Sequence, residues 1–117
     1  MVSVEMQEDL LKQQKETLIS VLQLHRQKPY LPVWGELFCA LRDIAQTARR
    51  LEKDVAVYAV HPVGMLWYRY REATFIVDIP DPGITISLTG EQLIDSLMQG
   101  RFSPLFDRSP ASASAEN

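Results

Sequence analysis

The pattern of hydrophobic and polar positions predicts two helices at the start of the chain. From Met6 to Gln27, apolar residues recur at helical spacing around a polar stretch at residues 12–17. Pro29 ends this segment, because a residue before proline disfavours the helical conformation. A second helix is predicted from Pro32 to Lys53. Its apolar residues recur every three or four positions and form one stripe: Trp34, Leu37, Phe38, Leu41, Ile44, Ala45, Ala48 and Leu51.

Four consecutive segments between residues 55 and 88 are predicted as strands of one antiparallel sheet. The first, residues 55–60, is apolar throughout, as expected for a strand that is covered on both faces or lies at a chain crossover. Arg71 and Glu72 are placed at the tip of the next hairpin, so Tyr68 should lie opposite Phe75. The fourth segment, residues 84–88, alternates apolar and polar residues and should be half buried.

The residues after the strands predict one short helix and a polar tail. Thr89 to Gln92 matches a capping box, which marks a helix start, and Gly100 should end that helix. The segment from Phe102 to Phe106 either folds back onto the domain or is offered to a partner. Residues 107–117 are small and polar and are predicted to be disordered. We therefore expect a single α+β domain over residues 1–106, with helices mainly on one face of a four-stranded antiparallel meander.

Composition and charge narrow the function classes. The 117 residues, of which 46% are hydrophobic, can form one domain with a core that needs no metal or disulfide. With 12 basic and 15 acidic residues, the chain lacks the positive field typical of nucleic-acid binding, which is thereby disfavoured. Cys39 is the single cysteine, and neither a signal peptide nor a membrane span is predicted. A cytoplasmic protein is expected.

Residue groups typical of catalysis or metal binding are missing from the sequence. His25 and His61 belong to no ligand-spaced pair, so we expect no metal, no cofactor and no catalytic residue. Cys39 lies almost opposite the apolar stripe of its helix, and the nearby carboxylates of Glu36 and Asp43 disfavour a reactive thiolate. We expect it to be shielded, either under the first helix or at a dimer contact.

The segment from Trp67 to Arg71 interleaves aromatic residues with arginines. Such strands serve as platforms for single-stranded RNA, but alternation places Tyr68 and Tyr70 on the face that the helices should cover. The residues left outward have the apolar centre and polar rim of a protein interface. The candidate partner-binding residues are Met65, Trp67, Arg69, Arg71, Ile76, Phe102 and Phe106. If the first helix or a second copy covers this face, Trp67 and Ile76 are instead core residues.

In its general arrangement, the chain from Tyr30 to Phe106 resembles small accessory proteins of cyanobacteria and plastids. Those proteins assist the assembly of large complexes such as carboxysomes or photosynthetic machinery. Together with the predicted patch, the resemblance favours a non-enzymatic adapter or assembly chaperone that binds the tail or surface of a subunit of a larger assembly. Self-association as a homodimer stays open. So do an RNA-binding module that uses residues 67–71 and a small-ligand-binding or enzymatic domain with a pocket formed by tertiary structure.

Overall fold

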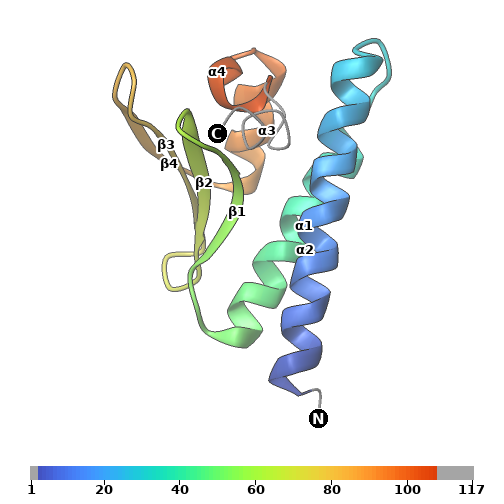
Figure 1. Cartoon of the computed structure of the whole chain (residues 1–117), viewed down its shortest axis with the longest axis vertical. Coiled ribbons are helices and arrows are strands. Elements are labelled where there is room, and N and C mark those ends of the chain that lie inside the picture. The colour runs from blue at the N-terminus through green and yellow to red at the C-terminus, as the bar shows by residue number, and fades with distance from the viewer. Residues whose placement is uncertain (1–2, 108–117) are drawn as a thin grey trace.

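The computed structural model describes residues 3–107 and places all its helices on one side of a four-stranded antiparallel sheet (Figure 1). The predicted α+β class, the meander and the order of elements are confirmed, and one further short helix follows them. The predicted disordered tail lies outside the described residues from residue 108 onward. In chain order the elements are α1 (Val4–Gln27), α2 (Trp34–Leu51), β1 (Val55–Val60), β2 (Gly64–Arg69), β3 (Thr74–Ile79), β4 (Ile84–Leu88), α3 (Gly90–Met98) and α4 (Ser103–Phe106).

The two long helices form a hairpin that covers the inner face of the sheet. The Ser3 hydroxyl caps α1 by accepting a hydrogen bond from the Met6 amide at 3.2 Å. α2 ends where Glu52 adopts a left-handed conformation, with φ of 52°. α1 buries only three leucines, whereas α2 buries residues on a wider face: Leu37, Ala40, Leu41, Ile44, Ala45, Thr47 and Ala48. Within residues 3–107, no helix combines the length and the apolarity that crossing a membrane requires.

The pairing of β2 with β3 follows the predicted register. Tyr68 lies opposite Phe75 and Trp67 lies opposite Ile76. The two pairs point to opposite faces of the sheet, because side chains alternate along a strand. Gly64, at the start of β2, has no room for a side chain, since a Cβ atom there would lie 2.5 Å from the carbonyl oxygen of Asp78.

The prediction that β1 is covered on both faces or lies at a crossover is wrong. β1 is an edge strand, and its pairing with β2 shifts register between Ala56 and Tyr58. At this irregularity the neighbouring residues Val57 and Tyr58 are both buried, whereas Ala59 is exposed. The unbroken apolar run therefore reflects a local bulge in an edge strand.

The predicted capping box opens α3. The Gln92 amide donates to the Thr89 hydroxyl at 3.2 Å, and the Thr89 amide donates to the Gln92 side chain at 3.0 Å. The helix ends at Met98, just before Gly100, whose φ of 75° is accessible mainly to glycine. The predicted start of this helix at the capping box and its predicted end before Gly100 are confirmed.

The segment from Phe102 to Phe106 folds back onto the domain. Phe102 is 2% exposed and Phe106 is 7% exposed. The Phe106 ring stacks on Tyr58 with a centroid distance of 5.4 Å, and its carbonyl accepts a hydrogen bond from Arg26 at 3.0 Å. α4 thus joins the C-terminal end of α1 to the sheet. Phe102 and Phe106 are core residues, and we remove them from the candidate partner-binding set.

Candidate functional site

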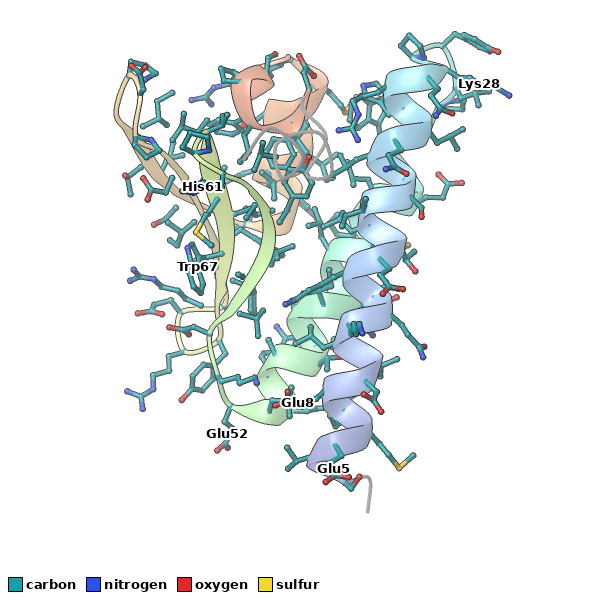
Figure 2. The ribbon with its side chains drawn as sticks, in the orientation of Figure 1. Glu5, Glu8, Lys28, Glu52, His61 and Trp67 are labelled. Atoms are coloured by element: carbon teal, nitrogen blue, oxygen red, sulfur yellow. The ribbon has the colours of Figure 1, made fainter. Side chains whose placement is uncertain are left out.

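The outer face of the sheet has no helix over it in the described part of the chain (Figure 1). Figure 2 shows Trp67 projecting from the sheet on the side away from the helices. Trp67 is partly exposed, so the alternative in which the first helix covers it does not hold. The outward-facing side chains of β2 and β3 form a surface that we call the outer-face patch: Met65, Trp67, Arg69, Thr74, Ile76 and Asp78.

Cross-strand pairing places apolar residues at the centre of the outer-face patch. Trp67 lies opposite Ile76, and such directly paired side chains are close enough to pack on one another. Ile76 is only 9% exposed, so Trp67 supplies more of the accessible apolar surface. Arg69 is exposed at one end of the patch. At the other end, the Asp78 carboxylate accepts a hydrogen bond from the Thr85 hydroxyl at 3.1 Å.

A hollow of about 370 Å³ continues the outer-face patch beyond Met65. This volume falls within the range of roughly 300–1,000 Å³ that is usual for ligand sites. Its lining comes from the turns at the upper end of the sheet in Figure 1 and from the adjoining strand ends. The lining residues are Ala59, His61, Pro62, Gly64, Met65, Asp78 and Pro80.

The sequence-based prediction missed the contribution of His61, Pro62 and Pro80 to this surface. A signal was available, because the first and third turns of an antiparallel meander lie at the same end of the sheet. In this sheet the first turn joins β1 to β2 and the third turn joins β3 to β4, and proline occurs in both turns. Combining that topology with the outward position of Met65 would have placed the prolines beside the patch.

Arg71 lies in the turn between β2 and β3, at the margin of the outer-face patch. Its Nε donates a hydrogen bond to the Tyr70 hydroxyl at 3.1 Å, and its guanidinium lies 5.7 Å from the centre of the Tyr70 ring. This hydrogen bond raises the pKa of Arg71, which remains a cation. The Arg71 side chain thus packs on Tyr70 in the adjoining turn, whereas the structure groups four of the predicted partner-binding residues on the outer face of the sheet: Met65, Trp67, Arg69 and Ile76.

Tyr68 faces the core. It is 1% exposed, and its ring lies 5.0 Å from the ring of Phe75. Its hydroxyl accepts a hydrogen bond from Arg49 of α2 at 3.2 Å. A base-stacking platform on this segment would need Tyr68 to point outward, which this packing prevents.

The cysteine and the two histidines lie in separate places. Cys39 lines an open groove with Thr17 and Val21 of α1, His25 packs against Trp34 with a centroid distance of 4.7 Å, and His61 lines the hollow. Within residues 3–107, no group of three or more His, Cys, Asp or Glu side chains could hold a metal ion.

The expected position of Cys39 under the first helix is wrong, because its side chain is exposed, and a contact with a second copy stays a prediction. α1 packs along the flank of α2 that carries Thr47, whose hydroxyl donates to the Gln14 side chain at 2.9 Å. The helix thus passes beside Cys39 instead of over it.

Cys39 is expected to react with iodoacetamide in the folded protein at a rate within about tenfold of that of a free cysteine at neutral pH, because access does not limit it. The rate is measured by mass spectrometry on folded and denaturant-unfolded protein, with Cys39→Ser as the unreactive control. Alkylation that becomes about a hundredfold faster on unfolding would contradict the exposed position.

Comparisons of the chain with protein-family models, with curated proteins and with solved structures find no significant match. Its function is therefore inferred from its own surface.

Proposed function

We propose that this protein is a non-enzymatic adapter or assembly chaperone of the cytoplasm that binds another protein through the outer-face patch. The observation that carries the proposal is the apolar pair of Trp67 and Ile76 at the centre of a sheet face without helical cover. Tryptophan, methionine and arginine are enriched at protein interfaces, and all three occur in the patch.

The outward positions of β4 show what an ordinary solvent-facing strand looks like in this sheet. Thr85 and Ser87 are both exposed and both polar, as expected for an antiparallel sheet with one face in water. β2 departs from this pattern, because Met65 and Trp67 occupy the equivalent outward positions. A bound partner would remove that apolar surface from water.

The patch also indicates what chemistry the partner surface has. An apolar side chain would pack on Trp67 or enter the hollow beside Met65. Acidic groups would face Arg69 at the rim and Arg71 in the adjoining turn, where charge complementarity favours the correct orientation. A subunit of a carboxysome or photosynthetic assembly is the partner class that the resemblance to accessory proteins suggests.

Affinity purification of the tagged full-length protein from its native cell, followed by mass spectrometry, tests this proposal. A protein partner is expected to co-purify with the wild-type chain and to be lost with Trp67→Ala. Tyr30→Ala is the matched control, because Tyr30 is an aromatic residue 77% exposed outside the patch. The proposal fails if Trp67→Ala retains the same proteins as the control. Recovery of RNA alone, lost steeply as salt is raised, would favour the nucleic-acid alternative.

A further inference from the structure

A second cavity lies on the opposite side of the sheet, between α2, the inner face of β2 and β3, and the start of α3. Its volume is about 390 Å³, again in the usual range for a small-molecule site. The rings of Phe38, Tyr68 and Phe75 contribute to its wall. The charged residues in its lining are two arginines and one glutamate, namely Arg42, Arg49 and Glu91. The cavity thus combines aromatic surface with an excess of positive charge.

The residues that α2 contributes to the cavity lining all lie on one face of this helix. Phe38, Arg42, Ala45 and Arg49 follow one another at intervals of four, three and four residues, which is the spacing of a single helix face. The two arginines are two turns apart, or roughly 10 Å along the helix axis. Side chains of that length can converge on one ligand between them.

Both guanidinium groups have hydrogen-bond donors left for a ligand. Arg49 donates from Nη1 to the Tyr68 hydroxyl at 3.2 Å, and a guanidinium carries five N–H groups in all. Because Tyr68 is fixed in the core, this contact holds Arg49 beside the aromatic wall. Arg42 has a 4.0 Å ion pair with Asp43, and both side chains are about half exposed, so that pair holds Arg42 only weakly.

Gly90 leaves the partly exposed ring of Phe38 accessible from the cavity, whereas Phe75 is 3% exposed and forms the floor behind it. A Cβ atom at this position would lie 3.5 Å from Phe38 and 3.8 Å from Phe75, so a larger side chain here would cover the Phe38 ring. Gly90 and Glu91 are also the first two residues of α3, where backbone N–H groups have no acceptor within the helix and favour a negative charge nearby.

We propose that this cavity binds an organic monocarboxylate. The apolar part of the ligand rests on the ring of Phe38, and its carboxylate accepts hydrogen bonds from Arg42 and Arg49. Guanidinium and carboxylate groups match in geometry and form strong charge-assisted hydrogen bonds. The Glu91 carboxylate at the same cavity disfavours ligands with a second negative charge. A free small acid and the C-terminus of a polypeptide share this chemistry. The inference does not rest on the proposed adapter function, because Trp67 faces the other side of the sheet.

Titration of the isotope-labelled full chain with hydrocinnamate, followed by NMR, tests the inference. We expect chemical-shift changes concentrated at Ala45, Ala73 and Gly90 and a Kd on the order of 1 mM, as is usual for a ligand of this size. The uncharged hydrocinnamide should bind about tenfold more weakly or not at all. A short peptide ending in phenylalanine, compared with the same peptide amidated, separates the two ligand sources.

Substitutions of the lining residues test whether hydrocinnamate binds in this cavity. Arg42→Gln and Arg49→Gln are each expected to weaken hydrocinnamate binding about tenfold, and Gly90→Leu should abolish it by filling the space over the Phe38 ring. Arg50→Gln is the matched control, because Arg50 neighbours Arg49 on α2 but does not line the cavity. Since Arg49→Gln also removes the bond to Tyr68, Arg42→Gln and Gly90→Leu decide the matter if that variant unfolds.

Several outcomes would overturn the inference: no shift at the lining residues, equal affinity for hydrocinnamide, or an Arg50→Gln effect as large as that of Arg42→Gln. Preference for the free-acid peptide over its amidated form would assign a chain terminus as the ligand. If hydrocinnamate binds and the free-acid peptide does not, the ligand is a small acid. Either of these two results upholds the site.

Discussion

Phe102→Ala is expected to lower the free energy of unfolding by about 3–5 kcal/mol, the range typical of removing a phenylalanine from a core. Phe102 is 2% exposed, and Leu105 and Phe106 of the same segment are buried with it. The loss combines the transfer of the ring to water with the cavity left behind, which the surrounding side chains fill only in part. α4 should loosen first, because it contains only four residues and is held by this packing.

Denaturant unfolding monitored by circular dichroism measures this effect. Met98→Ala is a suitable control, because Met98 is an apolar residue in the preceding helix that is 55% exposed, and its replacement should change stability by about 0.5 kcal/mol or less. A change below about 1 kcal/mol for Phe102→Ala would mean that the segment does not contribute to the core. It would then return to the set of candidate partner-binding residues.

Trp67→Ala is expected to weaken partner binding by about 2 kcal/mol or more, or roughly thirtyfold in Kd, as for other interface hot spots. The same change should reduce the stability of the free protein by only about 1 kcal/mol, the scale of one cross-strand side-chain pair. Trp67 is partly exposed, so its removal leaves an open surface with no enclosed cavity. Trp67→Ala should therefore reduce the free energy of partner binding by more than it reduces the free energy of unfolding.

Both quantities can be measured on one purified variant, by calorimetric titration with the partner recovered from cells and by denaturant unfolding. If self-association is the interaction, sedimentation replaces the titration. Tyr30→Ala should leave both values near those of the wild type, because this side chain is 77% exposed and lies outside the outer-face patch. Unchanged affinity in Trp67→Ala would remove the patch as the interface. A folding loss of about 3–5 kcal/mol would instead identify Trp67 as a core residue.

The local sequence pattern was sufficient to predict an element wherever the apolar residues of a segment follow a single helical or strand periodicity. The helical stripe around Leu41 and Ile44 predicted α2, and the alternation around Tyr68 and Phe75 predicted the register of β2 with β3. The capping box predicted the start of α3. Each of these features depends on side chains within a few residues of one another or on a single hairpin, so neighbouring residues specify them without the rest of the fold.

Only the tertiary structure decided which surfaces are covered. A periodic pattern says that two faces differ, but the packing of elements distant in sequence determines whether a face is buried. α1 lies beside Cys39 instead of over it, α4 closes back onto Tyr58, and all the described helices choose the same side of the sheet. Because the described helices all lie on that side, Trp67 on the opposite face stays accessible. The cavity between Arg42, Phe75 and Gly90 likewise exists only because α2, the hairpin and α3 meet there.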